Sequence, residues 1–471
     1  MYSVTGKSFN NSRGWRPLKC SVAMTVCAVL LFGCSVPRQV RSEHVAQYSE
    51  ALAKSTERAL PPGAVLALDD CIGIALENSL DVQAREINAR LAAIDRQAAF
   101  GNFLPQVELD VSYVKSDDQQ AIRAGGGYAA MSDRSVTETV LSAQQPIFVP
   151  QAWLLYSMTR RGEDVSALVT ERTRQLITLQ VTADYYACLS YMDMREHLEA
   201  SVSQAGALLD EIRAFHREGL AVASQAEGAA ALLQARRDEL KTNERSLRQA
   251  RARLLDTMGL SPLGEINLAA SCEPVMPAGN LEDEVLMALE NRLELHVSDR
   301  NIETADEKVR MAVADFLPSV VGLGGYMHSN DGYLRYADLW SYGLSGVLTV
   351  FDGFQNIADY RAARALREET FLQREQACLA IMLEVISARL QFDDACDAFD
   401  LAERTFRAHQ VALDEAEALR REGVIGHSEI LGAVVARDRA KAQLELSRYR
   451  RLVASATLLD VTGTPWKETD Q

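Results

Sequence analysis

Long stretches of the chain show the hydrophobic spacing of helices. Between Pro150 and Pro262 there is no proline, and the segment is amphipathic and rich in Ala, Leu, Gln, Arg and Glu. Proline breaks helix interiors, so we expect two long antiparallel helices here, the first from about residue 152 to 216, joined at Gly219-Leu220-Ala221. Leucines recur every seven residues on the second helix, at positions 233, 240, 247 and 254, although the intervening seam positions are partly Arg and Glu. This predicts either a helix with one apolar seam or coiled-coil packing.

The hydrophobic period changes to two after Pro105. Apolar residues alternate with polar ones at Val107, Leu109, Val111 and Tyr113. This predicts a strand, followed by a polar loop at 117–133 and a second strand at 135–148, in a hairpin of about 105–148. Segments 320–329 and 342–351 take the same places in a second hairpin of about 318–351. Such strands are typical of a transmembrane β-barrel with a polar lumen, although a soluble hairpin fits each pair equally well.

The chain contains the same unit twice. ALENSLDV at 75–82 recurs as ALENRLEL at 288–295, and Phe103-Leu104-Pro105 recurs as Phe316-Leu317-Pro318. Further on, Arg217-Glu218-Gly219 recurs as Arg421-Glu422-Gly423, and Leu254-Leu255-Asp256 with Gly259 recurs as Leu458-Leu459-Asp460 with Gly463. The spacings place about nine extra residues in the first copy, which we assign to the loop around Gly125-Gly126-Gly127. We therefore expect a first repeat at 66–262, a linker at 263–279, a second repeat at 280–464 and a tail at 465–471.

The first 33 residues have the layout of a secretory signal peptide. Four basic residues and no acidic ones precede an apolar run, Cys20–Gly33, that is too short to span a bilayer. Leu31-Phe32-Gly33-Cys34 resembles the bacterial lipoprotein cleavage box, which implies lipidation of Cys34 at the start of an N-terminal extension, 34–65. Ser35 after it implies sorting to the outer membrane. The alternative is an ordinary Cys34 beside a simple signal-peptidase site.

Composition excludes several functions. Acidic residues exceed basic ones by 65 to 49, giving a formal charge of −16, so nucleic acid is not an expected partner. The cysteines after Cys34 match no zinc-binding spacing, and we expect small buried hydrophobic residues rather than a disulfide or metal framework. The seven histidines include no HExxH pair. We therefore expect no enzyme, no catalytic or metal site and no cofactor.

The doubled order of helix, hairpin and two long helices resembles the TolC-like outer membrane efflux protein family. The resemblance runs from about Leu66 to Gly463, with Ala-Leu-x-Asn before the first helix, Leu-Pro opening each hairpin, and 348–354 (LTVFDGF) leading from strand to helix. It implies a mainly α fold with a membrane β-barrel portion. Three chains, each giving four strands, would close a 12-stranded barrel on an α-helical periplasmic tunnel. The homotrimer is thus what the resemblance implies. Two hairpins per chain cannot close a barrel and open strand edges are not viable in lipid, so an oligomer is also expected on physical grounds.

The resemblance also implies a function and partners. The chain would be the passive exit duct of a tripartite efflux or secretion system in the outer membrane of a Gram-negative bacterium. Its partners would be a periplasmic adaptor (membrane fusion) protein, an inner-membrane pump of RND or ABC type, and outer membrane lipid. The alternative is a periplasmic coiled-coil structural or adaptor lipoprotein without a pore, and an enzyme is a distant third.

Individual site residues follow from the family pattern. The periplasmic tip turns that meet the adaptor correspond to Gly219-Leu220 and Gly423-Val424. An acidic constriction ring corresponds to Glu429, but Gly432 stands where the family has a second acidic residue, so only one ring of three glutamates is expected. Pro105 and Pro318 mark the strand entries.

Overall fold

The computed structural model describes residues 41–61, 63–269 and 279–464. The chain divides into two compact units, residues 1–58 and 59–471. The described part of the first unit is one helix, α2 (Arg41–Ala59), which ends one residue beyond that unit. The expected signal peptide, Cys34, most of the expected linker and the tail 465–471 lie outside the described residues.

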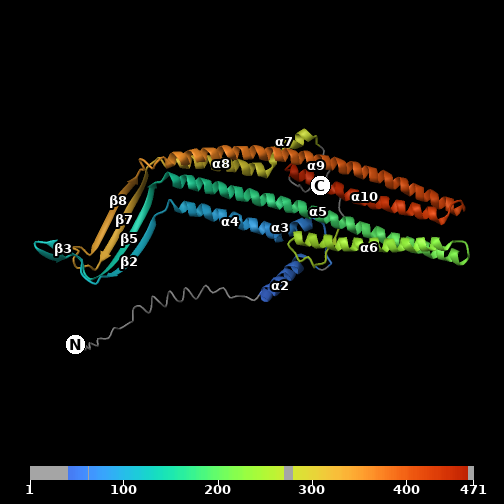
Figure 1. Ribbon diagram of the computed structural model, residues 1–471, viewed down its shortest axis with the longest axis horizontal. Coiled ribbons are helices and arrows are strands. Elements are labelled where there is room, and N and C mark those ends of the chain that lie inside the picture. Colours follow the sequence, from blue (N-terminus) through green and yellow to red (C-terminus); the bar gives the residue numbers. More distant parts are fainter. Residues whose placement is uncertain (1–40, 62, 270–278, 465–471) are drawn as a thin grey trace, which may run out of the picture. The chain divides into compact units, whose positions relative to one another are not determined.

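The second unit contains the same succession of helices twice (Figure 1). Each copy has a helix of 11 residues, one of 22, one of 67 or 68, and one of 35. They are α3 (Leu68–Asn78), α4 (Leu80–Gly101), α5 (Pro150–Arg217) and α6 (Ala223–Thr257), then α7 (Leu281–Asn291), α8 (Leu293–Ala314), α9 (Gln355–Arg421) and α10 (His427–Val461). The matching lengths confirm the predicted duplication. None of the described helices has a stretch that is both long and apolar enough to cross a membrane.

The two hairpins join into one antiparallel sheet with the strand order β2-β5-β7-β8. Its strands are β2 (Gln106–Lys115), β5 (Ser135–Phe148), β7 (Ser319–Ser329) and β8 (Asp338–Val347). The pairing of β5 with β7 joins the copies, with Leu141 opposite Tyr326. The helices follow the same order, because α4 packs on α5, α5 on α8 and α8 on α9. Within this unit, β2 and α4 therefore form one edge, and β8 and α9 form the other (Figure 1).

The segment predicted as a polar loop, 117–133, contains a small hairpin of its own. It is formed by β3 (Ala121–Ala124) and β4 (Gly127–Ala130), which pair antiparallel. Gly125 and Gly126 make the turn with φ of +56° and +91°, a backbone conformation that glycine adopts without steric cost. The connection from β7 to β8 is shorter and contains no strand, so the extra residues of the first copy lie at this hairpin, as expected.

The last strand begins and ends earlier than predicted. It covers 338–347, whereas alternation suggested 342–351. Its pairing with β7 ends where Ser319 faces Val347, because β7 begins directly after Pro318, which has no N–H to donate. Residues beyond Val347 therefore have no partner strand on that side.

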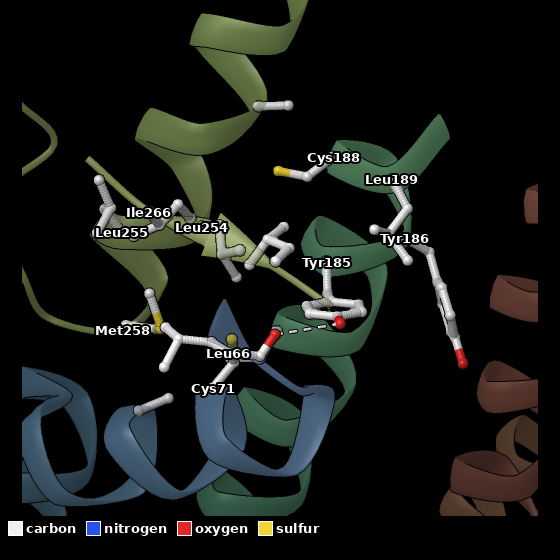
Figure 2. Close-up of a cluster of buried hydrophobic side chains, with 14 of the residues drawn as sticks. Leu66, Cys71, Tyr185, Tyr186, Cys188, Leu189, Leu254, Leu255, Met258 and Ile266 are labelled. Carbon is white, nitrogen blue, oxygen red and sulfur yellow. Dashed lines mark hydrogen bonds between the residues drawn. The ribbon is translucent and has the colours of Figure 1, made fainter. Parts of the chain in front are cut away.

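The largest apolar core lies where α3, α5 and α6 meet a two-stranded parallel ladder (Figure 2). The ladder pairs β1 (Val65–Leu66) with β6 (Asn267–Leu268), so the start of the first repeat pairs with the segment expected as the linker, 263–279. Tyr185 is 1% exposed, and its hydroxyl donates to the carbonyl of Ala269 at 2.8 Å and lies 3.4 Å from that of Leu66. Tyr185 therefore holds both strands against α5.

The leucine seam of α6 is buried against α5. Leu233, Leu247 and Leu254 are at most 9% exposed, and Leu240 is half-buried. The alternate seam positions Arg236, Asn243 and Ala250 are buried too. α5 and α6 thus pack along a heptad seam that includes polar residues, as in a coiled coil.

Two described cysteines are fully buried, as expected for small apolar residues. Cys71 and Cys188 are 0% exposed, while Cys378 and Cys396 are partly buried. Burial raises the pKa of the Cys71 and Cys188 thiols to about 12, so both stay protonated. These four described cysteines form no disulfide; Cys272 lies outside the described residues.

Candidate functional site

On one face of the four-stranded sheet, the two edge strands β2 and β8 expose mainly apolar side chains. On β2, Val107, Leu109, Val111 and Tyr113 point to one side and are 62 to 67% exposed, while Glu108, Asp110 and Ser112 point to the other. Pairing carries the first face across the sheet, because Val107 is opposite Ala143, Ala143 opposite Gly324, and Gly324 opposite Tyr342. On β8, Trp340, Tyr342 and Leu344 share this face and are 73 to 93% exposed. We call it the apolar sheet face; β5 and β7 divide less sharply.

Both edge helices also expose apolar side chains in a line. On α4 these are Leu80, Ile87, Leu91 and Ile94, which are 48 to 65% exposed. On α9 they are Leu372, Leu379, Leu383, Leu390 and Leu401, which are 58 to 67% exposed. At 3.6 residues per turn, each set lies on one side of its helix. We call these sets the α4 stripe and the α9 stripe.

The two long helix pairs reverse direction in the same kind of turn. Gly219 follows α5 and Gly423 follows α9, and each has φ +75°. The N–H of the next residue, Leu220 or Val424, donates to a carbonyl in the last helical turn at 2.8 or 2.9 Å. This is the glycine cap that ends a helix most economically. Leu220 and Val424 are 72 and 65% exposed, so each tip presents an apolar side chain.

The other residues singled out in the sequence lie near these features. Glu429 is exposed in the first turn of α10, three residues before Gly432. Pro105 and Pro318 stand directly before β2 and β7. The tip turns and Glu429 therefore lie at the opposite end of the long helices from the sheet, whereas the two prolines lie at the sheet (Figure 1).

Sequence reasoning missed a buried polar junction between the repeats. Asp438 of α10 is 4% exposed, and the Ser201 hydroxyl of α5 donates to its Oδ2 at 2.5 Å. A guanidinium nitrogen of Arg236, from α6, lies 3.7 Å from the same oxygen, and Nε2 of His197 lies 3.8 Å from Oδ1. The polar seam positions of α6 were the available signal, because Arg236 occupies one of them.

A second network joins the copies nearer the sheet. Arg172 of α5 pairs with Asp460 of α10 at 2.7 Å and with Glu294 of α8 at 2.7 Å. Arg292 also pairs with Glu294, at 2.9 Å. Asp460 comes from a motif present in both copies, yet its counterpart Asp256 is exposed. Of these two equivalent aspartates, Asp460 therefore forms an ion pair between the copies, whereas Asp256 lies exposed.

His197 predicts a pH dependence of stability. Burial lowers the pKa of its imidazole, with Arg437 and Lys441 acting in the same direction and Asp438 opposing them. The imidazole of His197 is thus protonated less readily in the folded protein than in the unfolded chain. Its contribution to the free energy of unfolding is therefore full above the ordinary histidine pKa of about 6.5 and decreases as the pH falls below that value. We expect the melting temperature, followed by circular dichroism, to fall less below this pH in His197→Gln than in the original protein.

The matched control for that measurement is His296→Gln, which changes an exposed histidine on α8. It should keep the original pH profile. A His197→Gln profile parallel to the original would show that other groups cause the acid loss.

A family model and several solved structures match this chain. A family model described as "Outer membrane efflux protein" matches residues 71–260 and 285–464. These two matched segments fall in the two copies, and together they cover more than half of the chain. A search of curated protein sequences finds no match.

Several solved structures share the fold at low sequence identity. The Campylobacter jejuni CmeC outer membrane channel has 15% identity and a TM-score of 0.73, covering 86% of this chain and 87% of its own. A structure of CusC, from work on folding and transmembrane channel formation, has 17% identity and a TM-score of 0.72, covering 84 and 92%. The open state of the Neisseria gonorrhoeae MtrE outer membrane channel has 19% identity and a TM-score of 0.67, covering 84 and 88%.

Proposed function

Since the chain belongs to the outer membrane efflux protein family and is the outer membrane channel of a tripartite efflux system, we propose that three copies of it form one duct. Its place is the outer membrane of a Gram-negative bacterium, with a helical periplasmic part. It is a transporter without enzymatic chemistry. The alternative of a coiled-coil lipoprotein without a pore is therefore set aside.

The observation that carries the trimer is the open edge of the sheet. β2 and β8 each have a neighbour on one side only within the chain. They run in opposite directions in a four-stranded antiparallel sheet, so β8 of one copy can pair antiparallel with β2 of the next. Closing the sheet removes every unpaired backbone group from lipid, and three chains give the 12-stranded barrel. The apolar sheet face would then contact lipid.

The helical layer supports the same closure. The α4 stripe and the α9 stripe lie on the two edges that β2 and β8 continue. Exposed apolar lines of this length on a helix mark contact with another protein surface. When copies join edge to edge, the stripe of one copy meets the neighbour's other edge, which buries both.

The tips are the proposed contact with the periplasmic adaptor. Leu220 and Val424 project from equivalent turns, and their exposed apolar side chains are suited to a protein partner. The inner-membrane pump, of RND or ABC type, would deliver cargo through that adaptor. Lipidation of Cys34 and the repeat bounds 66–262 and 280–464 belong to the same proposal.

Glu429 is the proposed constriction. In a trimer its three carboxylates would face one another near the tip and attract cations. We expect single-channel recordings in planar bilayers to show cation-selective steps. In Glu429→Gln the reversal potential in a salt gradient should move toward zero, because the neutral amide keeps the size of the side chain and removes its charge.

The controls for that recording separate the duct from the ring. Cross-linking must first show that both proteins are trimers, and Glu422→Gln removes an exposed carboxylate beside the tip without touching Glu429. Equal selectivity in all three proteins would discard the ring and keep the duct. Trimers that insert but never conduct, even with the adaptor added, would count against the proposed duct.

A further inference from the structure

An open apolar pocket lies where the first hairpin gives way to helices. Its volume is about 410 Å³, and it lies between the end of α4, the end of β5 and the start of α5. Every lining residue is aromatic or aliphatic: Phe100, Phe103, Pro146, Ile147, Val149, Ala152, Trp153 and Tyr156. We call it the junction pocket.

Aromatic rings form the walls of the junction pocket. The ring centroids of Phe103 and Trp153 are 4.8 Å apart, and Phe100 and Tyr156 each lie within 6.1 Å of Phe103. Yet the rings are not covered from outside, because Phe100 is 51% exposed and Trp153 is 64% exposed. Half-exposed rings around an open cavity of this size leave an apolar surface for another molecule to cover.

The junction pocket opens on the apolar sheet face. A Cβ built on Gly322 would lie 3.4 Å from the Ile147 side chain, so Ile147 projects on the side to which Gly322 points. Gly322 shares its face with Gly324 two residues on, and Gly324 is connected through Ala143 to Val107. The pocket is therefore continuous with the face that we propose contacts lipid.

A neighbouring copy of the chain would not cover the pocket. On α4, Phe100 lies on the side opposite the α4 stripe, given 3.6 residues per turn. The stripe is the surface proposed to meet the next copy. The pocket is thus left to face the membrane.

Two arginines lie one helical turn beyond the aromatic walls, on the side away from the sheet. Arg96 is four residues from Phe100 on α4, and Arg160 is four residues from Tyr156 on α5. Arg96 pairs with Glu163 at 2.7 Å. Arg160 is exposed, and among the described residues no ion pair involves it. An apolar pocket with a cation one helical turn away is complementary in charge and spacing to an amphipathic anion, whose apolar chain would enter the pocket and whose anionic group would meet the cation.

The geometry points to a binding site for an anionic glycerophospholipid, with one acyl chain in the junction pocket and the phosphate at Arg160. This inference rests on the proposed function, because it requires the sheet to lie in the membrane. Aromatic side chains favour the boundary between lipid and water, and basic residues attract phosphate there. Each copy of the chain would carry one such site.

Trp153 provides a direct readout of pocket occupancy. A variant with Trp15, Trp340 and Trp466 replaced by Phe keeps Trp153 as its sole tryptophan. Detergent-solubilised protein would be titrated with phosphatidylglycerol that carries bromine on its acyl chains, which quenches nearby indole fluorescence. We expect quenching of Trp153 that saturates at a low lipid fraction. The matched control keeps only Trp340, which lies on the apolar sheet face outside the pocket, and its quenching should rise without saturating.

Arg160→Ala tests the headgroup contact. It should raise the half-saturating lipid fraction about fivefold, which is the effect of one basic residue near an anionic surface. Arg404→Ala removes an exposed arginine of α9, well beyond the first turns that adjoin the sheet, and should change nothing. A half-saturating fraction that is unchanged in Arg160→Ala would overturn the contact.

Two results would overturn the lipid site itself. One is quenching of Trp153 that matches Trp340 without saturation. The other is saturation that appears only in Cys34→Ser, which would assign the pocket to an acyl chain of the protein's own anchor. Conductance of the same preparations keeps this test separate from the proposed function. If the protein inserts and conducts but shows no saturable quenching, only the lipid site is contradicted. If it does not insert into the bilayer, the proposed duct is contradicted.

Discussion

Replacing Gly259 by Ala is expected to prevent or severely weaken folding of the first repeat. Gly259 follows α6 with φ +71°, and an added Cβ would overlap the carbonyl oxygen of Asn78 and lie 2.8 Å from its carbon. Those atoms are backbone at the end of α3, so no side chain can rotate away. We expect a loss of more than about 3 kcal/mol, since overpacking against backbone adds to the cost of the left-handed conformation. Folded yield and thermal unfolding followed by circular dichroism would measure it.

The chain offers a graded set of controls for this substitution. Gly219 has φ +75° with nothing within 4 Å of an added Cβ, so Gly219→Ala should cost only about 1 kcal/mol. Gly463 is the counterpart of Gly259 in the second copy, and its added Cβ would lie 3.0 Å from the Asn291 side chain, so Gly463→Ala should fall between the two. Equal losses at Gly219 and Gly259 would show that backbone conformation alone matters and that the contact with Asn78 does not.

Placing charges on the α9 stripe is expected to abolish the trimer. In the double variant Leu379→Glu/Leu383→Glu, an assembled trimer would bury six carboxylates without partners, and each such burial costs several kcal/mol. Because both leucines are more than 60% exposed within one chain, the fold of a single copy should survive. Size-exclusion chromatography with light scattering would show monomers, and the helical circular dichroism signal would remain. Channel activity should be lost with the trimer.

Leu366→Glu is the matched control. Leu366 is 40% exposed on the same helix but lies about 120° around the helix axis from the α9 stripe, at 3.6 residues per turn. It should leave the trimer intact. A trimer that persists in the double variant would contradict the proposed edge-to-edge assembly and would require another interface.

Local signals in the sequence account for most of the secondary structure. No proline lies between 151 and 261 to interrupt the backbone hydrogen bonds, and Gly219 allows the chain to reverse. Both effects are local, so α5 and α6 lie where expected. The β3–β4 hairpin was missed because four-residue strands give too little alternation to detect. The last strand was displaced because its end depends on where β7 begins, not on its own residues.

The candidate site was predicted only where a short motif creates it. The tip turns need a glycine with positive φ, and both glycines were identified from the repeated Arg-Glu-Gly motif. Asp438 could not be identified, because its partners come from α5 and α6, more than 200 residues earlier. The junction pocket was missed for the same reason, since its aromatic walls come from separate helices.

By itself, the sequence determined the duplication, the extent of the first long helix and the tight turns, because periodicity, glycine and proline act within a few residues. It also determined the family through the order of its repeated motifs. It did not show that two helices, α3 and α4 or α7 and α8, precede each hairpin where the family pattern suggested one. Only the tertiary structure decided that β5 pairs with β7, that Gly259 packs on Asn78, and which edges stay open. These are contacts between segments far apart in the chain, and they depend on the packing of whole helices and strands, which no local pattern of residues encodes.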